Sequence, residues 1–197
     1  ALHLTGDLTF ESVYVTPPNK VNGGLGPIFN NSSCISCHPK DGRAPFPTNL
    51  NARSGFFMRV SLPGIADNGG PVPVPGFGLQ IQNQAVFGVE PEAQFQVTYS
   101  TIVEELADGT KVTLRKPHYS LVESYIPIPA NILLSPRIGS PVFGLGLLEA
   151  IPEADILAQI DANDANQDGI YGKANYVYDV ISKQTKLGRF GWKANTA

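Results

Sequence analysis

The sequence has 197 residues, of which 42% are hydrophobic and 16% are charged, and its formal net charge is −3. This length and composition predict a globular chain with one sizeable domain or two small ones. The charges form no run of one sign, which argues against nucleic acid as a partner, and no apolar stretch reaches the roughly 18 residues of a membrane span. With 20 glycines and 17 prolines, the chain is expected to be rich in ordered loops.

The first predicted elements are a strand and a short helix. Residues 8–15 (LTFESVYV) are rich in β-forming side chains and predict a strand. Residues 23–38 begin with Gly and Pro and then carry both cysteines, which we place on a short helix with Asn31 or Ser32 near its N-cap. Residues 39–54 are polar and carry three prolines, so they predict a loop.

The middle of the chain predicts a β-hairpin. Residues 56–62 (FFMRVSL) fit a strand or a helical turn, and the many prolines and glycines of 63–78 predict irregular structure. At about 94–115, apolar and polar residues alternate on both sides of an Asp108-Gly109 turn. This alternation is the clearest local signal in the sequence.

The last third of the chain predicts short elements. Residues 141–149 (PVFGLGLLE) are apolar and end in a carboxylate, and 153–160 have helical spacing with acids in the first turn. The segment 161–172 is rich in Asp, Asn and Gly and predicts a loop. Residues 175–181 and 187–192 predict a closing pair of strands.

The most informative motif is Cys34-Ile35-Ser36-Cys37-His38, a CxxCH string. Two thiols about one helical turn apart can form thioethers with the two vinyl groups of one porphyrin, and the following imidazole can bind the iron. The motif therefore predicts covalently attached haem c, with His38 as an axial ligand. A thioredoxin-like CxxC would sit in a βαβ unit, and a zinc site would need about four ligands; the sequence supports neither.

The second axial ligand stays open at this level. Met58 and His118 are the candidates, because Met and His are the usual partners of a haem-ligating His. Met58 could equally be a core methionine, and His118 an ordinary structural histidine. His3 lies near the chain terminus, and an open or water-bound iron is a further alternative.

Glu149 is a candidate catalytic acid–base. A carboxylate at the end of an apolar run can be partly buried and could move protons at an open haem face. An exposed glutamate at a helix end is the alternative.

The loop after the predicted helix resembles part of a calcium site. Asp164, Asn166, Asp168 and Gly169 match the first half of an EF-hand loop, but Asn175 stands where that loop needs a bidentate Glu. Calcium is therefore a candidate cofactor, and a loop of Asx turns without an ion is the alternative.

Five segments resemble the N-terminal half of the di-haem oxidoreductases, a family also called thiol oxidoreductases and related to the di-haem c-type peroxidases and MauG. The segments are 24–43 (GLGPIFNNSSCISCHPKDGR), 112–121 (VTLRKPHYSL), 135–153 (SPRIGSPVFGLGLLEAIPE), 164–177 (DANQDGIYGKANYV) and 187–195 (LGRFGWKAN). The resemblance assigns Cys34, Cys37 and His38 to haem and adds weight to Glu149. It counts against Met58 and His118 as fixed ligands.

The resemblance also implies a fold, a place and a function. We expect residues 1–197 to form a cytochrome c-like haem module, mainly irregular with few helices and a small antiparallel β insertion (α+β), as the N-terminal portion of a larger di-haem protein. We expect a periplasmic or extracellular oxidoreductase of the di-haem peroxidase-like type, whose partner is a redox protein or a second haem domain. The alternatives are a non-catalytic electron-transfer module and a structural or assembly protein in which haem is only a core.

Overall fold

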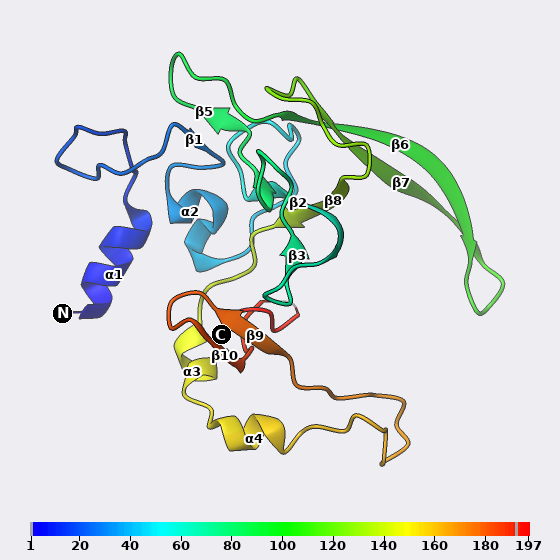
Figure 1. The fold of residues 1–197 in the computed structure, drawn as a ribbon. Coiled ribbons are helices and arrows are strands. Elements are labelled where there is room, and N and C mark those ends of the chain that lie inside the picture. The colour runs from blue at the N-terminus through cyan, green and yellow to red at the C-terminus, as the bar shows by residue number, and fades with distance from the viewer. Residues whose placement is uncertain (1, 192) are drawn as a thin grey trace. The chain divides into compact units, whose positions relative to one another are not determined.

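The computed structural model describes residues 2–191 and 193–197 (Figure 1). The chain divides into two compact units, one made of Ala1–Gly64 and Pro71–Pro141 and the other of Ile65–Gly70 and Val142–Ala197. The helices are α1 (Leu2–Glu11), α2 (Cys34–Cys37), the 3₁₀ turn η1 (Pro39–Asp41), α3 (Leu145–Glu149) and α4 (Glu153–Leu157). The strands are β1 (Ile28–Phe29), β2 (Phe56–Ile65), β3 (Pro71–Val72), β4 (Gln80–Ile81), β5 (Gln84–Ala85), β6 (Gln94–Glu105), β7 (Lys111–Val122), β8 (Leu133–Ile138), β9 (Tyr176–Asp179) and β10 (Gln184–Leu187).

The first unit is built around β2, which pairs with β3, β4 and β8. Alternate residues of β2 point to one face of the sheet, and Phe56, Met58 and Val60 are buried there. Met58 and Ile81 have no exposed surface, and each such burial contributes about 1.5–3 kcal/mol. The FFMRVSL segment is therefore a strand, and its buried face forms the core of this unit.

A long hairpin leaves this core (Figure 1, green). Strands β6 and β7 pair antiparallel from Gln94↔Val122 to Glu105↔Lys111. Phe95 and Leu121 are buried at its base, whereas most of its outer residues are exposed. The hairpin that the sequence places at about 94–115 thus continues to Val122, because its base packs into the core.

Side-chain amides connect the loops around the core. Asn51 binds both backbone groups of Phe95, with its Nδ2 donating to the carbonyl (3.1 Å) and its Oδ1 accepting from the N–H (2.7 Å). Asn30 donates to the carbonyl of Ile81 (2.7 Å) and to Oδ1 of the buried Asn83 (2.9 Å). These bonds satisfy backbone groups that short strands leave unpaired.

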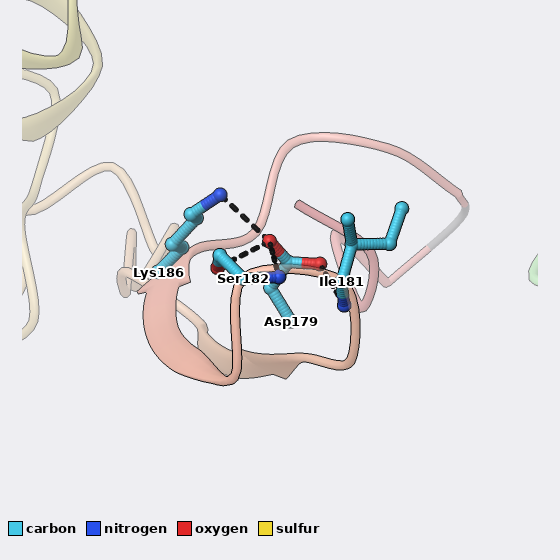
Figure 2. Close-up of polar contacts among 4 residues, drawn as sticks. All are labelled: Asp179, Ile181, Ser182 and Lys186. Atoms are coloured by element: carbon cyan, nitrogen blue, oxygen red, sulfur yellow. Dashed lines mark hydrogen bonds and ion pairs between the residues drawn. The ribbon is translucent and has the colours of Figure 1, made fainter.

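The second unit has few buried side chains. Of its described hydrophobic residues, Leu187 is buried, while Phe143, Leu147 and Ile181 are largely exposed. Its β9–β10 hairpin closes around Asp179, which accepts hydrogen bonds from the Ile181 N–H (3.1 Å), the Ser182 hydroxyl (2.6 Å) and the Lys186 ammonium (2.6 Å) (Figure 2). Local hydrogen bonds therefore hold this hairpin.

The strand prediction for residues 8–15 is wrong, because α1 extends over Leu2–Glu11. Contacts at the spacing of one helical turn replace strand pairing: His3 lies 2.9 Å from Asp7, and the Thr9 hydroxyl donates to the Thr5 carbonyl. β-Forming residues are a weak guide where no partner strand is available.

Two other boundaries differ from the sequence predictions. The closing strands are β9 and β10, so the second strand ends at Leu187 instead of beginning there, because the turn is set at Asp179. Within 63–78, β2 continues to Ile65 and Pro71–Val72 forms a short edge strand. Pairing with β2 provides the regular structure that the prolines argued against.

Candidate functional site

The CxxCH motif forms a single helical turn, α2. Ser33 is its N-cap, one residue after Ser32 and two after Asn31, and its hydroxyl accepts a hydrogen bond from the Ser36 N–H (3.3 Å). Both thiols are free; Cys34 is exposed and Cys37 is half-buried. The helix thus presents one thiol to solvent and holds the other against the protein.

The sulfur of Cys37 lies among polar groups of Asn31 and Ser54. The Asn31 amide donates to Sγ of Cys37 (3.4 Å) and to the Ser54 carbonyl (3.0 Å), and Cys37 Sγ also lies 3.4 Å from that carbonyl. Burial raises the pKa of the Cys37 thiol, and the hydrogen bond from Asn31 opposes this rise. Asn31 Oδ1 is buried without a partner among the described residues. Asn31 therefore positions the inner thiol.

His38 is fixed by a backbone carbonyl far away in sequence. Its Nδ1 lies 2.7 Å from the carbonyl oxygen of Ser140. A carbonyl can only accept, so Nδ1 carries the proton and Nε2 keeps its lone pair. Metal-ligating histidines are commonly oriented by this type of hydrogen bond. The arrangement leaves Nε2 as the nitrogen that can bind iron.

Two glycines allow the backbone to approach the motif. A Cβ on Gly139 would lie 2.9 Å from the Cys37 carbonyl oxygen and 3.0 Å from His38 Cε1, and a Cβ on Gly55 would lie 2.6 Å from the same oxygen. The Gly139 N–H donates to the Gly55 carbonyl (2.8 Å), so the two glycines are held together. The Phe10 ring lies 6.2 Å from the His38 ring. The residue at position 139 must be small for His38 to keep its place.

These residues fit a covalently bound haem. Two free thiols one helical turn apart match the two vinyl groups, and an imidazole with an available Nε2 follows directly. The sequence identified Cys34, Cys37 and His38, whereas Ser140, Gly139, Gly55 and the role of Asn31 come from the structure. No local pattern relates Ser140 to His38, because they meet only through tertiary packing.

The candidate second ligands have other partners. Met58 is fully buried in the core, where its thioether fills space between strands. His118 is exposed on β7, with Nε2 2.7 Å from the Ser100 hydroxyl. His3 is exposed and paired with Asp7. These positions favour the structural interpretation of all three, and a sixth ligand from Met58 or His118 stays a prediction.

Glu149 ends α3 in the second unit, and its side chain is exposed. Its apolar neighbours do not bury the carboxylate, because they are themselves exposed, and this agrees with the alternative of an exposed glutamate at a helix end. The backbone at this helix end is held by Arg189, whose Nη1 donates to the carbonyls of Leu148 (3.3 Å), Glu149 (3.2 Å) and Ile151 (2.6 Å). Arg189 thus caps the turn that carries Glu149, a role with no local sequence signal.

In the calcium-like loop, the carboxylate oxygens accept hydrogen bonds from backbone N–H groups of the same loop. Asp164 Oδ1 accepts from the N–H groups of Asp168 (2.9 Å) and Gly169 (3.2 Å), and Asp168 Oδ1 accepts from that of Ile170 (2.8 Å). Asn175 donates to the carbonyls of Lys193 and Ala194. The part of the chain that the structure describes contains no group of three or more His, Cys, Asp or Glu side chains arranged to hold a metal ion. This geometry favours Asx turns.

Two thiols followed by an imidazole are a donor set compatible with haem. The model of one family, described as "Di-haem oxidoreductase, putative peroxidase", matches residues 1–197. The chain belongs to the di-haem oxidoreductases, and this membership implies a haem cofactor. Comparison with curated proteins and with solved structures found no match. None of the described helices is both long and apolar enough to cross a membrane.

Proposed function

We propose that this chain is a c-type haem oxidoreductase of the di-haem peroxidase-like type. Haem would be attached through Cys34 and Cys37, with Nε2 of His38 as an axial ligand to its iron. The observation that carries the proposal is the hydrogen bond from His38 Nδ1 to the Ser140 carbonyl beside two free thiols. When bound, the haem supplies an iron that accepts and releases single electrons.

The residues around the motif have separate tasks in this proposal. Ser140 fixes the tautomer and direction of the His38 imidazole, because its carbonyl oxygen accepts the Nδ1 proton. Asn31 holds the Cys37 sulfur and can still donate to it after a thioether has formed, because the sulfur acts as acceptor. Cys34 is exposed and open to reaction with the second vinyl group.

Variants of the motif test these tasks. We expect His38→Ala to keep haem attached through both sulfurs but to change its absorption spectrum. Cys34→Ala should leave a single thioether and weaken attachment, while Ile35→Val, a conservative change between the two cysteines, serves as the control. An unchanged spectrum in His38→Ala would contradict the axial role.

Within this proposal, Glu149 is the acid–base group for peroxide reduction. Its place in the LLEAIPE string and the clamp from Arg189 on its backbone support the assignment. In the full-length protein, we expect Glu149→Gln to slow peroxide reduction by about 10²–10⁴-fold, the range for loss of a general acid–base, with haem content unchanged. Asp155→Asn, on the next helix and outside that string, is the matched control.

The competing function is a non-catalytic electron-transfer module that passes electrons to a partner haem. A six-coordinate, low-spin iron with unchanged peroxide turnover in Glu149→Gln would support it. A high-spin ferric spectrum would support the enzyme, because peroxide chemistry needs an iron face that can open.

Three further expectations belong to the proposal. The chain would form a cytochrome c-like haem module in the N-terminal part of a larger di-haem protein, and would work in the periplasm or outside the cell. Its redox partner would be a second haem domain or another protein. Family membership and the single CxxCH motif in these 197 residues support this view.

A further inference from the structure

An open cavity of about 200 Å³ lies in the first unit, lined by residues of β2, β7, β8 and the segment that follows η1. Three aromatic rings contribute to its wall: Phe46 and Phe56 meet edge-to-face (5.8 Å between centroids), and Phe56 stacks on Tyr119 (6.2 Å). Ile138 adds an aliphatic surface, and Arg43 and Arg137 are the two cationic residues of the lining. No lining residue is acidic. The cavity thus combines an apolar wall with two exposed positive charges.

Chain connectivity places this cavity beside the motif. Phe56 follows Gly55, and Ile138 precedes Gly139, the two glycines that contact the Cys37 carbonyl. A Cβ on Gly55 would also touch the Ala44 side chain, which follows Arg43. Three wall residues, Arg43, Phe56 and Ile138, are therefore each one residue away in the chain from Ala44, Gly55 or Gly139, which lie close to the Cys37 carbonyl or to each other. Phe56 also pairs with Ile138 across β2 and β8.

This combination selects a ligand class. Guanidinium groups bind carboxylates through bidentate hydrogen bonds, and aromatic side chains pack well against a planar apolar group. The volume is below the roughly 300–1,000 Å³ of a site that encloses a whole drug-sized ligand. The cavity suits one edge of a larger flat molecule that carries carboxylates.

We infer that this cavity binds the propionate-bearing edge of the haem attached at Cys34 and Cys37, with Arg43 and Arg137 pairing with its carboxylates. The inference rests on the proposed function. A free aromatic carboxylate has the same chemistry and is the other source that the test must separate.

The reduction potential of the holoprotein tests this assignment. A cation near the haem disfavours the ferric state, which has one more positive charge than the ferrous state. We therefore expect Arg43→Gln/Arg137→Gln to lower the equilibrium constant for reduction about tenfold, or about 59 mV for a one-electron couple. Arg115→Gln, whose guanidinium lies 4.7 Å from the Tyr99 ring on the hairpin, is the control and should leave the potential unchanged.

Three outcomes would overturn the assignment. A potential unchanged in the double variant, with haem mass intact, would refute the cavity assignment and leave the proposed function standing. Saturable binding of benzoate to the wild-type holoprotein, lost in the double variant, would assign the cavity to a free carboxylate. A chain at bare polypeptide mass would refute both the proposed function and this inference. Both arginines are exposed, so matching thermal melts should verify that the variants fold.

Discussion

At the residue scale, the contact between Gly139 and the motif has a steric consequence. Gly139→Ala would place a methyl group 2.9 Å from the Cys37 carbonyl oxygen and 3.0 Å from His38 Cε1. Because one neighbour is backbone, we expect a loss of about 1–3 kcal/mol in unfolding free energy and a changed haem spectrum. Gly26→Ala, outside the helices and strands and with only an ordinary 3.6 Å contact between the added carbon and the Ile28 carbonyl oxygen, is the control. Denaturant titration measures the difference, and equal stability of both variants would contradict the close packing.

Glu92 gives the first unit a pH dependence. It is 5% exposed, and its Oε2 accepts a hydrogen bond from the Gln82 N–H (2.6 Å). Burial raises the pKa of the Glu92 carboxyl, and the bond from Gln82 opposes the rise. The folded state then keeps the proton to a higher pH than the unfolded chain, whose glutamate pKa is about 4.3. The contribution of Glu92 to the free energy of unfolding is therefore fully present below the unfolded-state pKa and is lost as pH rises through the folded-state pKa.

Glu92→Gln tests this sign. Glutamine keeps an oxygen that can accept from Gln82 but cannot ionise, so we expect the fall in stability above about pH 4.3 to become shallower. Denaturant titrations of both proteins between pH 4 and 7 measure the effect. Parallel pH profiles would show that the carboxyl does not titrate with folding.

At the element scale, the β9–β10 hairpin depends on one carboxylate. Hydrogen bonds from Lys186, Ser182 and the Ile181 N–H hold the pKa of Asp179 well below its usual range (Figure 2). The stabilisation of the folded state by the Asp179 carboxylate is present above the unfolded-state pKa of about 3.9 and is lost as pH falls through the folded-state pKa. We expect Asp179→Asn to speed amide exchange of Ile181 and Ser182 at pH 7. Glu105→Gln is the control, because Glu105 and Lys111 are 4.0 Å apart and exposed.

The loop between α4 and β9 yields a prediction about metal. Asp164 and Asp168 use oxygens to accept backbone N–H groups, so an ion would have to compete with these bonds. We expect a chelator to leave the melting temperature unchanged. A fall on chelation that disappears in Asp168→Ala would instead demonstrate calcium, because an ion that binds only the folded state stabilises it.

Elements could be predicted from sequence where the local pattern agrees with the tertiary contacts. The β6–β7 hairpin has alternation and a Gly109 turn with φ of +83°, and α2 follows from its capping serine. Residues 8–15 have β-forming side chains but no partner strand: residues 8–11 belong to α1, and beyond them only Val15 makes an isolated bridge, to Gly23. Strand β8 was missed, because its pairing with β2 joins residues more than seventy positions apart.

At the scale of the whole molecule, the motif could be predicted and its surroundings could not. Cys34, Cys37 and His38 form a local string with one chemical meaning. Ser140 and Gly139 contact the motif only because β8, which precedes them, pairs with β2. The same pairing brings together the cavity residues Phe56 and Ile138. Glu149 is an exposed glutamate at a helix end, one of the two alternatives that the sequence left open, because the apolar side chains before it are themselves exposed.

The central claim is that haem is bonded to Cys34 and Cys37, and the mass of the intact protein tests it most directly. The chain should be expressed with the machinery for haem attachment and measured under denaturing conditions, with Cys34→Ala/Cys37→Ala as the control. We predict a mass one haem above that of the polypeptide for the wild type and the bare polypeptide mass for the control. A wild-type chain at the bare polypeptide mass would contradict the account.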